Sequence, residues 1–323
     1  MKNKRIGFLL FFIFALYSVL CTPHCTYAAG TTGADFLKVG LGARAVGMGE
    51  AFTGVADDVN AIAWNPSGIA QLQGKQVSFM YNMYLLNPSF SDMGFTYLAY
   101  AQPLTIKGED WGAVGGNFVY ANYGNFIGYD ENAAKTADFT CSDLLVTLCY
   151  AKNITISNIP VAVGGNLKII REALAENSAM GVAVDLGALY RPEEMPRLAI
   201  GLAVQNIGTP LVFISDATPM PLLVKIGAGY DMFINAANDI LFSADAVVPF
   251  NSAAGLRIGA EYSYNSMFFA RLGYKTDSIV NINALAGLTT GVGFKWDKYN
   301  ADFAFVPYEE LGNTYRLSLG AQF

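Results

Sequence analysis

Three charged residues near the N-terminus, Arg44, Asp57 and Asp58, are the first candidates for a functional site. A charge that is buried without a partner is costly, whereas an arginine and a carboxylate can form an ion pair. One hypothesis is therefore a latch, in which Arg44 pairs with a carboxylate and holds the N-terminal segment in place. The alternative is that these charges are solvated and that the aspartates cap short helices.

A second candidate is the dipeptide Asn65-Pro66. Proline lacks a backbone donor and biases the residue before it toward extended angles. The functional hypothesis is a hinge that lets the N-terminal segment move. The alternative is a plain structural turn.

Apolar residues between these polar ones form a third group. The steps from Met48 through residues 52, 55 and 59 to Ile62 are 4, 3, 4 and 3, which is helical spacing, and Gly54 would interrupt the helix. Thr53 and Asp57 are possible N-caps of short helical pieces. The candidates for an apolar ligand pocket are Phe52, Val55, Ile62 and Trp64. For Trp64 the alternative is packing without a ligand.

The sequence offers little for catalysis. Its one histidine, His24, lies in the N-terminal stretch that we expect to be cleaved off. The usual Ser-His-Asp and Cys-His arrangements need histidine, as do the usual zinc sites that combine it with cysteine. The two remaining cysteines, Cys141 and Cys149, are too few ligands for zinc, and no G-x-x-x-x-G-K loop occurs. We therefore expect no catalytic residue, no metal site, no cofactor and no enzyme activity.

Residues 1–29 have the pattern of a signal peptide. Lys2, Lys4 and Arg5 precede an apolar run over residues 6–20, and small residues at Thr26 and Ala28 suit cleavage near Ala28 or Ala29. Removing those three basic residues takes the net charge from −6 to −9. An acidic exported protein is a poor candidate for nucleic acid binding, so we expect no nucleic acid partner.

After residue 74 the pattern changes to strict alternation, with apolar residues opposite glycine, small polar residues and charges. Fourteen such segments are predicted, near 76–86, 92–102, 111–121, 139–151, 160–171, 179–190, 196–206, 222–231, 238–248, 254–264, 267–275, 284–296, 299–306 and 313–323. The even count and the glycine-rich polar face favour a closed antiparallel transmembrane β-barrel over a secreted β-sandwich. The longest connections, 122–138 and 207–221, are expected outside the cell.

The last segment carries an assembly signal by this interpretation. From Tyr315 to Phe323 the apolar residues alternate with Arg316, Ser318 and smaller groups, and the chain ends in the apolar register. Barrels of the outer membrane commonly end in this way because their assembly machinery reads the last strand. Tyr315 and Phe323 are therefore the predicted signal residues.

The chain is thus divided into a signal peptide (1–29), an N-terminal plug (30–74) and a barrel (75–323). Charged residues of mixed sign are predicted to face the barrel lumen, where cross-strand ion pairing is the alternative to a binding site. They are Lys168, Asp185, Arg197, Lys225, Asp245, Arg257, Glu261, Arg271, Lys295, Asp302 and Arg316.

The plug also resembles a known family. The stretch 42–52 (GARAVGMGEAF), the triplet 56–58 (ADD) and the stretch 64–68 (WNPSG) look like the N-terminal signature of the PorV/PorQ-type outer-membrane proteins. That family is similar to the long-chain fatty acid transporter FadL, whose plug has a related Asn-Pro-Ala motif. Here Ser67 stands where that transporter usually has alanine. The resemblance implies a fourteen-stranded, FadL-like barrel.

Two functions follow from this resemblance. The first is a non-enzymatic barrel that assists delivery or anchoring of secreted proteins at the cell surface, as in type IX secretion. The second is an uptake channel for long-chain fatty acids or other hydrophobic small molecules. In either case the expected location is the outer membrane, after signal-peptide cleavage. The expected partners are outer-membrane lipid, the assembly machinery, and secreted cargo proteins or a hydrophobic small molecule.

Overall fold

The computed structural model describes residues 32–83, 93–276, 287–307 and 313–323. The expected signal peptide, residues 1–29, lies outside these ranges. No helix within them has the length and apolar character needed to cross a membrane.

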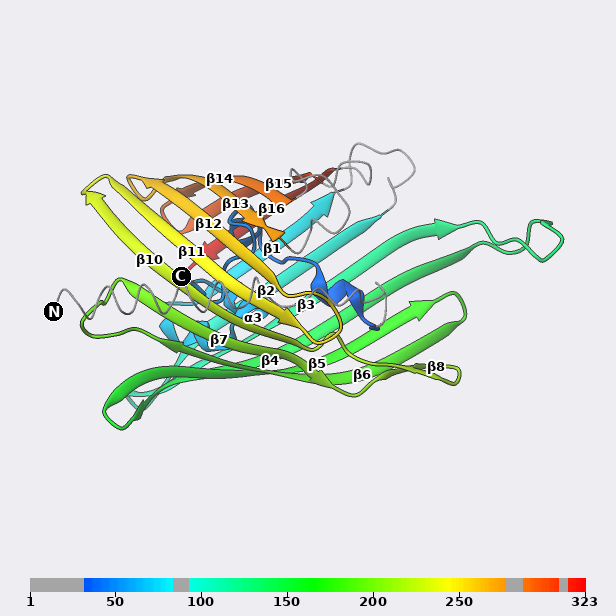
Figure 1. The fold of residues 1–323 in the computed structure, drawn as a ribbon, viewed down its shortest axis with the longest axis horizontal. Helices are drawn as coiled ribbons and strands as arrows, with labels where there is room; N and C mark the ends of the chain where they lie inside the picture. The colour runs from blue at the N-terminus through cyan, green and yellow to red at the C-terminus, as the bar shows by residue number, and fades with distance from the viewer. Residues whose placement is uncertain (1–31, 84–92, 277–286, 308–312) are drawn as a thin grey trace.

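In the described ranges, fourteen antiparallel strands close into one barrel, in agreement with the predicted fold class and strand count (Figure 1). Wall strands that follow one another in the sequence pair with each other, including β7 with β10. β1 pairs with β16 and closes the ring. The wall strands are β1 (Gln76–Met83), β2 (Gly94–Ile106), β3 (Glu109–Phe126), β4 (Phe139–Ile156), β5 (Ile159–Leu174), β6 (Asn177–Tyr190), β7 (Leu198–Gly208), β10 (Leu223–Asn235), β11 (Asn238–Pro249), β12 (Gly255–Tyr264), β13 (Phe268–Lys275), β14 (Leu288–Trp296), β15 (Tyr299–Pro307) and β16 (Asn313–Gln322). A separate hairpin consists of β8 (Leu211–Phe213) and β9 (Asp216–Thr218).

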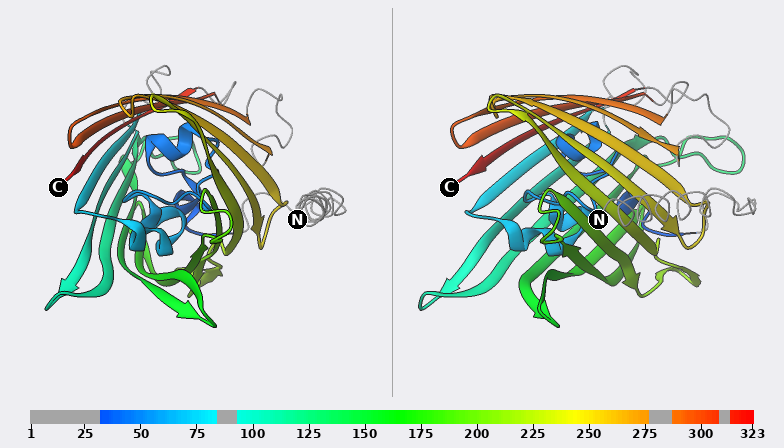
Figure 2. Two further views of the ribbon diagram at one scale, coloured as in Figure 1. Left: turned by 90° about the vertical axis from the view of Figure 1, so that its left-hand side faces the viewer. Right: turned by 60° about the vertical axis from the view of Figure 1, so that its left-hand side comes forward.

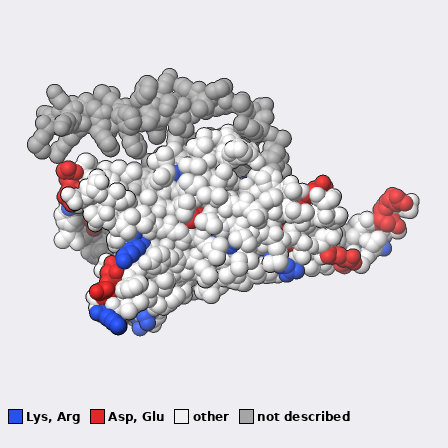
Figure 3. All heavy atoms as spheres, turned by 90° about the horizontal axis from the view of Figure 1, so that it is seen from below, with Lys and Arg blue, Asp and Glu red and all other residues white. Residues whose placement is uncertain are grey.

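The two faces of the wall alternate as predicted. In β16 the side chains of Thr314, Arg316 and Ser318 are buried in the lumen, while Leu317 and Leu319 are exposed on the outside. Large apolar side chains cover the exterior of the other strands as well. The face in Figure 3 is mostly uncharged along its length, and acidic and basic side chains gather at its two ends. This exterior suits contact with lipid.

The two ends of the barrel differ in their turns. Short turns join strands at one end. Residues 107–108 and 157–158 are two-residue turns with positive φ angles throughout, and the three-residue turn 265–267 has positive φ angles at Asn265 and Ser266. Connections at the other end include residues 127–138 and the segment that carries β8 and β9. Outer-membrane barrels have short periplasmic turns and longer extracellular loops. We therefore assign the short-turn end to the periplasm.

Several strands are longer than predicted. β3, β4 and β5 have 18, 18 and 16 residues, whereas the expected segments were 111–121, 139–151 and 160–171. The reason is that two-residue turns with positive φ, such as Ser157-Asn158, match the twist of the strands and need no loop. The connection expected at 122–138 is accordingly reduced to 127–138, and the one at 207–221 contains β8 and β9.

The N-terminal segment lies inside the ring of strands (Figure 2). Its elements are η1 (Asp35–Lys38), α2 (Ala43–Gly47), α3 (Ala61–Trp64) and η2 (Pro66–Gln71). We call residues 32–74 the plug. The plug begins at the extracellular end, where the Gly33 N–H donates to the Pro219 carbonyl 3.0 Å away. It ends at the periplasmic end, where Lys75 and Phe323 exchange backbone hydrogen bonds.

One local prediction for the plug was wrong. Residues 48–60 form turns despite their helical spacing, and neither Thr53 nor Asp57 is an N-cap, since Gly42 and Asn60 precede the two α-helices. The cause is that the wall provides partners for this backbone: the N–H groups of Phe52 and Thr53 donate to Asp245 at 3.0 and 2.9 Å. A helix is not needed where the wall satisfies the chain.

Glycines of the wall let the plug backbone approach closely. A Cβ at Gly164 of β5 would lie 2.6 Å from the Ser67 nitrogen and 2.7 Å from the Pro66 carbonyl carbon. Similar close approaches occur at Gly187, Gly201, Gly259 and Gly273. The glycine-rich face recognised in the sequence is therefore the surface on which the plug packs.

We predict that Gly164→Ala destabilises the folded barrel by about 1–3 kcal/mol, because the added methyl group would overlap the plug backbone. Gly165 is the matched control, since a Cβ there would meet only ordinary contacts, the first at 3.4 Å. The measurement is the midpoint of unfolding. Unfolding is monitored by the difference in gel mobility between folded and heat-denatured protein. Equal losses in Gly164→Ala and Gly165→Ala would contradict this account.

Candidate functional site

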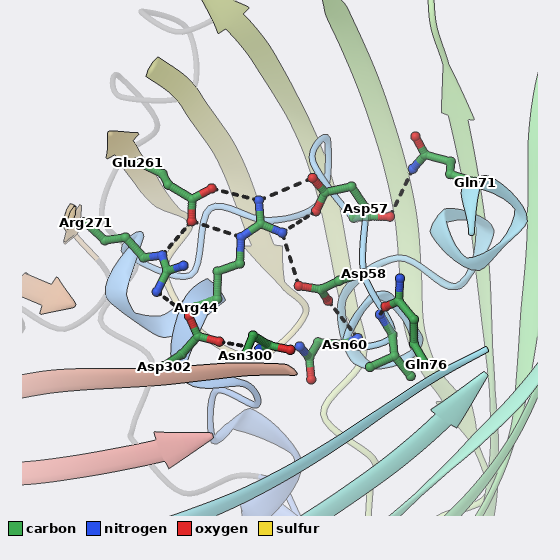
Figure 4. Close-up of polar contacts among 12 residues, drawn as sticks. Arg44, Asp57, Asp58, Asn60, Gln71, Gln76, Glu261, Arg271, Asn300 and Asp302 are labelled. Carbon is green, nitrogen blue, oxygen red and sulfur yellow. Dashed lines mark hydrogen bonds and ion pairs between the residues drawn. The ribbon is translucent and has the colours of Figure 1, made fainter. Parts of the chain in front are cut away.

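Arg44 lies where the plug meets the wall near the periplasmic end. It extends from α2, and its guanidinium contacts two plug carboxylates and one wall carboxylate (Figure 4). Its Nη1 is 2.6 Å from Asp57 and 3.2 Å from Asp58. Its Nε and Nη2 donate to the two oxygens of Glu261 on β12, at 3.0 and 2.9 Å. The three predicted latch charges are thus together, and Glu261 ties them to the barrel.

The contacts continue along the wall from Glu261. Arg271 on β13 donates to Glu261 at 2.5 Å and to Asp302 on β15 at 2.7 Å. Asp302 also accepts from the Asn300 side chain at 2.8 Å. We call Arg44, Asp57, Asp58, Glu261, Arg271 and Asp302 the Arg44 network. It joins the plug to three strands through bidentate, charge-assisted hydrogen bonds, which are the stronger kind.

A cavity of about 300 Å³ lies beside the Arg44 network. Besides that network, polar side chains line it from the plug and from the strand ends and a turn at the periplasmic side: Asn60 of the plug, and Gln76, Lys295, Lys298, Asn300 and Gln322 of the wall. The mixture of charges gives this cavity no single sign. It suits water and polar groups, and it differs from the mostly apolar pocket expected of a carrier for hydrophobic molecules.

The network fixes the charge states of the plug residues. Burial lowers the pKa of the Arg44 guanidinium, but Asp57, Glu261 and Asp58 outweigh it and hold that pKa well above its ordinary value. Burial raises the pKa of the Asp58 carboxyl, and Arg44 only partly opposes this effect. Arg44 therefore stays charged at physiological pH.

Glu50 is a functional candidate that sequence reasoning missed. It is buried, and its carboxylate lies 2.7 Å from Lys275 and 2.9 Å from Arg257. Burial raises the pKa of Glu50, but the positive charges of Lys275, Arg257 and Arg316 prevail and lower it to about 2. The sequence did contain an indication of this role. Glu50 is an acidic residue of the plug, and several lysines and arginines of the wall were predicted to face the lumen.

Wall side chains also bind the plug backbone. Thr289 accepts from the Gly49 N–H at 2.9 Å, and Ser318 accepts from the Ala43 N–H at the same distance. Gln205 donates to the Ala63 carbonyl at 2.9 Å, and Asn166 donates to the Ile62 carbonyl at 2.7 Å. Cross-strand pairing between wall residues occurs too, as between Lys168 and Asp185 at 2.7 Å.

Asn65 occupies a fully buried turn. Its side-chain nitrogen donates to the carbonyls of Thr53 and Ala188 at 2.9 and 3.1 Å, and its oxygen accepts from Ser67. Pro66 follows as the first residue of η2. Movement about a hinge at this position would have to break hydrogen bonds to both the plug and the wall. These hydrogen bonds therefore favour a structural turn over a hinge.

The four apolar candidates are all buried but do not form one group. Phe52, Val55 and Trp64 pack together, whereas Ile62 belongs to a larger core with β2 to β5. The Trp64 indole donates to the Leu41 carbonyl at 2.9 Å, and the Lys225 ammonium lies 4.7 Å from its ring centre. These contacts favour packing of Trp64, and its role in a ligand pocket remains a proposal.

The predicted assembly residues lie on the outside of the wall. Tyr315 contacts the rings of Phe303 and Phe305, and the Phe323 side chain is exposed beside Lys298. Within the described ranges, no three His, Cys, Asp or Glu residues are grouped so as to hold a metal ion.

Comparisons with known proteins give a family and a fold. Residues 24–249, more than two thirds of the chain, match the family model described as Type IX secretion system protein PorV. The solved toluene transporter TbuX of Ralstonia pickettii is similar, with a TM-score of 0.59 and 14% identity over 88% of this chain and 98% of that chain. The toluene transporter TodX of Pseudomonas putida gives 0.54 and 13%, over 88% and 96%. No curated protein matches the sequence.

We predict that Arg44→Gln lowers the free energy of unfolding by about 3 kcal/mol, because it leaves Asp57, Asp58 and Glu261 without their shared partner. Lys38→Gln is the control: its ion pair with Asp35 is exposed, so the loss should stay below about 1 kcal/mol. Unfolding midpoints in detergent and protease cleavage within the plug are the measurements. A variant Arg44→Gln as stable and as resistant as the wild type would end the latch hypothesis.

The Glu50 pairs should be resistant to acid. A carboxylate whose pKa is lowered on folding stabilises the folded state above its ordinary pKa of 4.5, and this stabilisation is lost as the pH falls toward about 2. We therefore predict a constant stability difference between wild type and Glu50→Gln above about pH 5, which shrinks only between pH 4.5 and 2. Unfolding midpoints over this range are the test, and a difference already lost at pH 5 would contradict the lowered pKa.

Proposed function

This chain belongs to the PorV family, and we propose that it is a non-enzymatic outer-membrane barrel that assists delivery or anchoring of secreted proteins at the cell surface. Residues 1–29 would leave as the signal peptide, and residues 30–74 would act as a permanent plug. The proposal rests first on the family match, which spans the plug and most of the wall.

The way in which the plug is held supports this proposal. Salt bridges from Arg44 and Glu50 reach β12 and β13, and glycines of β5, β6, β7, β12 and β13 let the plug approach the wall closely. A plug held at so many points favours a lumen that stays closed. The extracellular surface of the barrel is then the part that partner proteins can contact, and a protein that acts through interactions needs such a surface.

Two extracellular segments have exposed apolar side chains. Ile127 and Tyr129 lie between β3 and β4, and Val212 and Ile214 lie in the β8–β9 hairpin. Ile214 is 87% exposed at the tip of that hairpin. Exposed apolar groups beyond the lipid-facing wall are typical of protein contact sites. We propose that secreted cargo or another surface protein contacts these two segments.

The alternative function is uptake of long-chain fatty acids or other hydrophobic molecules. It is supported by the barrel fold that the chain shares with the two toluene transporters, a likeness of fold alone at these identities. Such a carrier would need apolar space next to Phe52, Val55 or Trp64, and these three side chains instead pack on one another.

The two functions predict different results in cells. With a photo-crosslinking amino acid at Tyr129 or Ile214, we expect capture of identified exported proteins, because both side chains project from the extracellular end. Trp296, an exposed residue at the periplasmic end, is the control position and should capture none of them. Crosslinked products are identified by mass spectrometry.

The opposite outcome is also defined. If no exported protein is captured, while an organic extract of gently purified protein contains acyl chains at near one per barrel, the secretion function is wrong. Trp64→Ala should then reduce the acyl content.

A further inference from the structure

Arg316 of β16 is an unusual residue of the lumen. It is only 2% exposed, and among the described residues it is the largest of the fully buried side chains. Its Nε and Nη1 atoms are buried, and neither has a hydrogen-bond partner. A guanidinium has five N–H donors and cannot lose its charge, so a buried one without acceptors is costly. Buried polar atoms in proteins nearly always have a hydrogen-bond partner, so these atoms indicate a partner from outside the protein chain.

Two neighbours of Arg316 also have buried polar atoms without a hydrogen-bond partner. Asn82 of β1 stands directly across from Arg316 in the strand register, and both of its side-chain polar atoms are buried without a partner. Thr314 lies two residues before Arg316 on the same lumen face, and its buried hydroxyl also lacks a partner. Five unpartnered atoms thus gather on two adjacent strands.

The plug does not supply the missing acceptor. Glu50 is close enough for Arg316 to favour its charged form, but its carboxylate oxygens are bound by Lys275 and Arg257. Glu50 thus forms its printed ion pairs with two other cations of the wall and not with Arg316. In contrast, Arg44 and Arg271 elsewhere in the lumen are each paired with two or more carboxylates.

The types of the unpartnered atoms indicate what would fit. Arg316 offers two donors, the Asn82 amide nitrogen and the Thr314 hydroxyl offer one each, and only the Asn82 oxygen is purely an acceptor. An excess of donors around a guanidinium that keeps its charge suits an anion and disfavours a cation.

We propose that a small monovalent anion, a halide or the carboxylate group of a small molecule, binds in the lumen at Arg316, Asn82 and Thr314. This site lies apart from the Arg44 network, toward the extracellular half of β16. The proposal is independent of the secretion function, because it follows from the unpartnered groups alone.

The first test uses the anion itself. The unfolding midpoint of the purified full barrel is measured in sodium bromide, chloride or acetate, against the same concentration of a bulky sulfonate salt. We expect the wild-type midpoint to rise with the concentration of the small anion. Arg316→Gln should weaken the apparent anion affinity by at least about tenfold, as for other charge-assisted hydrogen bonds.

Matched variants separate the site from general salt effects. Arg316→Lys should retain part of the anion dependence because it keeps the charge, and Asn82→Ala provides a second test should Arg316→Gln fail to fold. Lys295→Gln removes an exposed lysine at the periplasmic end and should leave the dependence unchanged.

A second experiment distinguishes the source of the anion. In bromide-soaked crystals, an anomalous peak within hydrogen-bond distance of Arg316 would identify a free halide. A carboxylic acid that copurifies with the wild type and is lost in Arg316→Gln would identify a small molecule. If the midpoint is the same in all salts and neither signal occurs, water fills the site and the proposal is wrong. An anion dependence that survives in Arg316→Gln and Asn82→Ala would equally overturn it.

Discussion

The structure depends on a hydrogen-bonding constraint: an irregular segment buried inside a barrel must find partners for its backbone in the wall. The plug elements have only four to six residues each, so most of their N–H and C=O groups have no partner within a helix. Wall side chains provide it, with Asp245 and Thr289 accepting, and Gln205 and Asn166 donating. The plug and the barrel are therefore halves of one folded unit.

Most of the wall could be predicted from the sequence because its signal is local. A residue in a strand faces either lipid or lumen, and strict alternation such as that of β12, with Arg257 and Glu261 inward and Ile258 and Tyr262 outward, states the register directly. The extra length of β4 and β5 at the turn that joins them was missed for an equally local reason. Ser157 and Asn158 are ordinary polar residues, and only their left-handed backbone makes the turn that continues both strands.

The site was predictable only in part, because its partners are far apart in the chain. Arg44 could be expected to pair with an acid, and Asp57 and Asp58 were candidates. Glu261 is 217 residues from Arg44 in the sequence. The two side chains meet only because of the path that the plug takes through the barrel. Glu50 was overlooked because a single glutamate in a glycine-rich motif carries no spacing signal. The helical spacing of residues 48–62 misled, since wall contacts replaced the helix that this pattern favours.

The seam between the first and last strands has a consequence for biogenesis. Lys75 and Phe323 join there, directly after a plug that contacts β13–β16 through α2 and β3–β6 through η2. The plug therefore contacts strands on both flanks of the β1–β16 seam. A lumen charge that loses water before it has a partner is costly. An order of assembly in which the plug meets its wall partners before β1 pairs with β16 would avoid that cost.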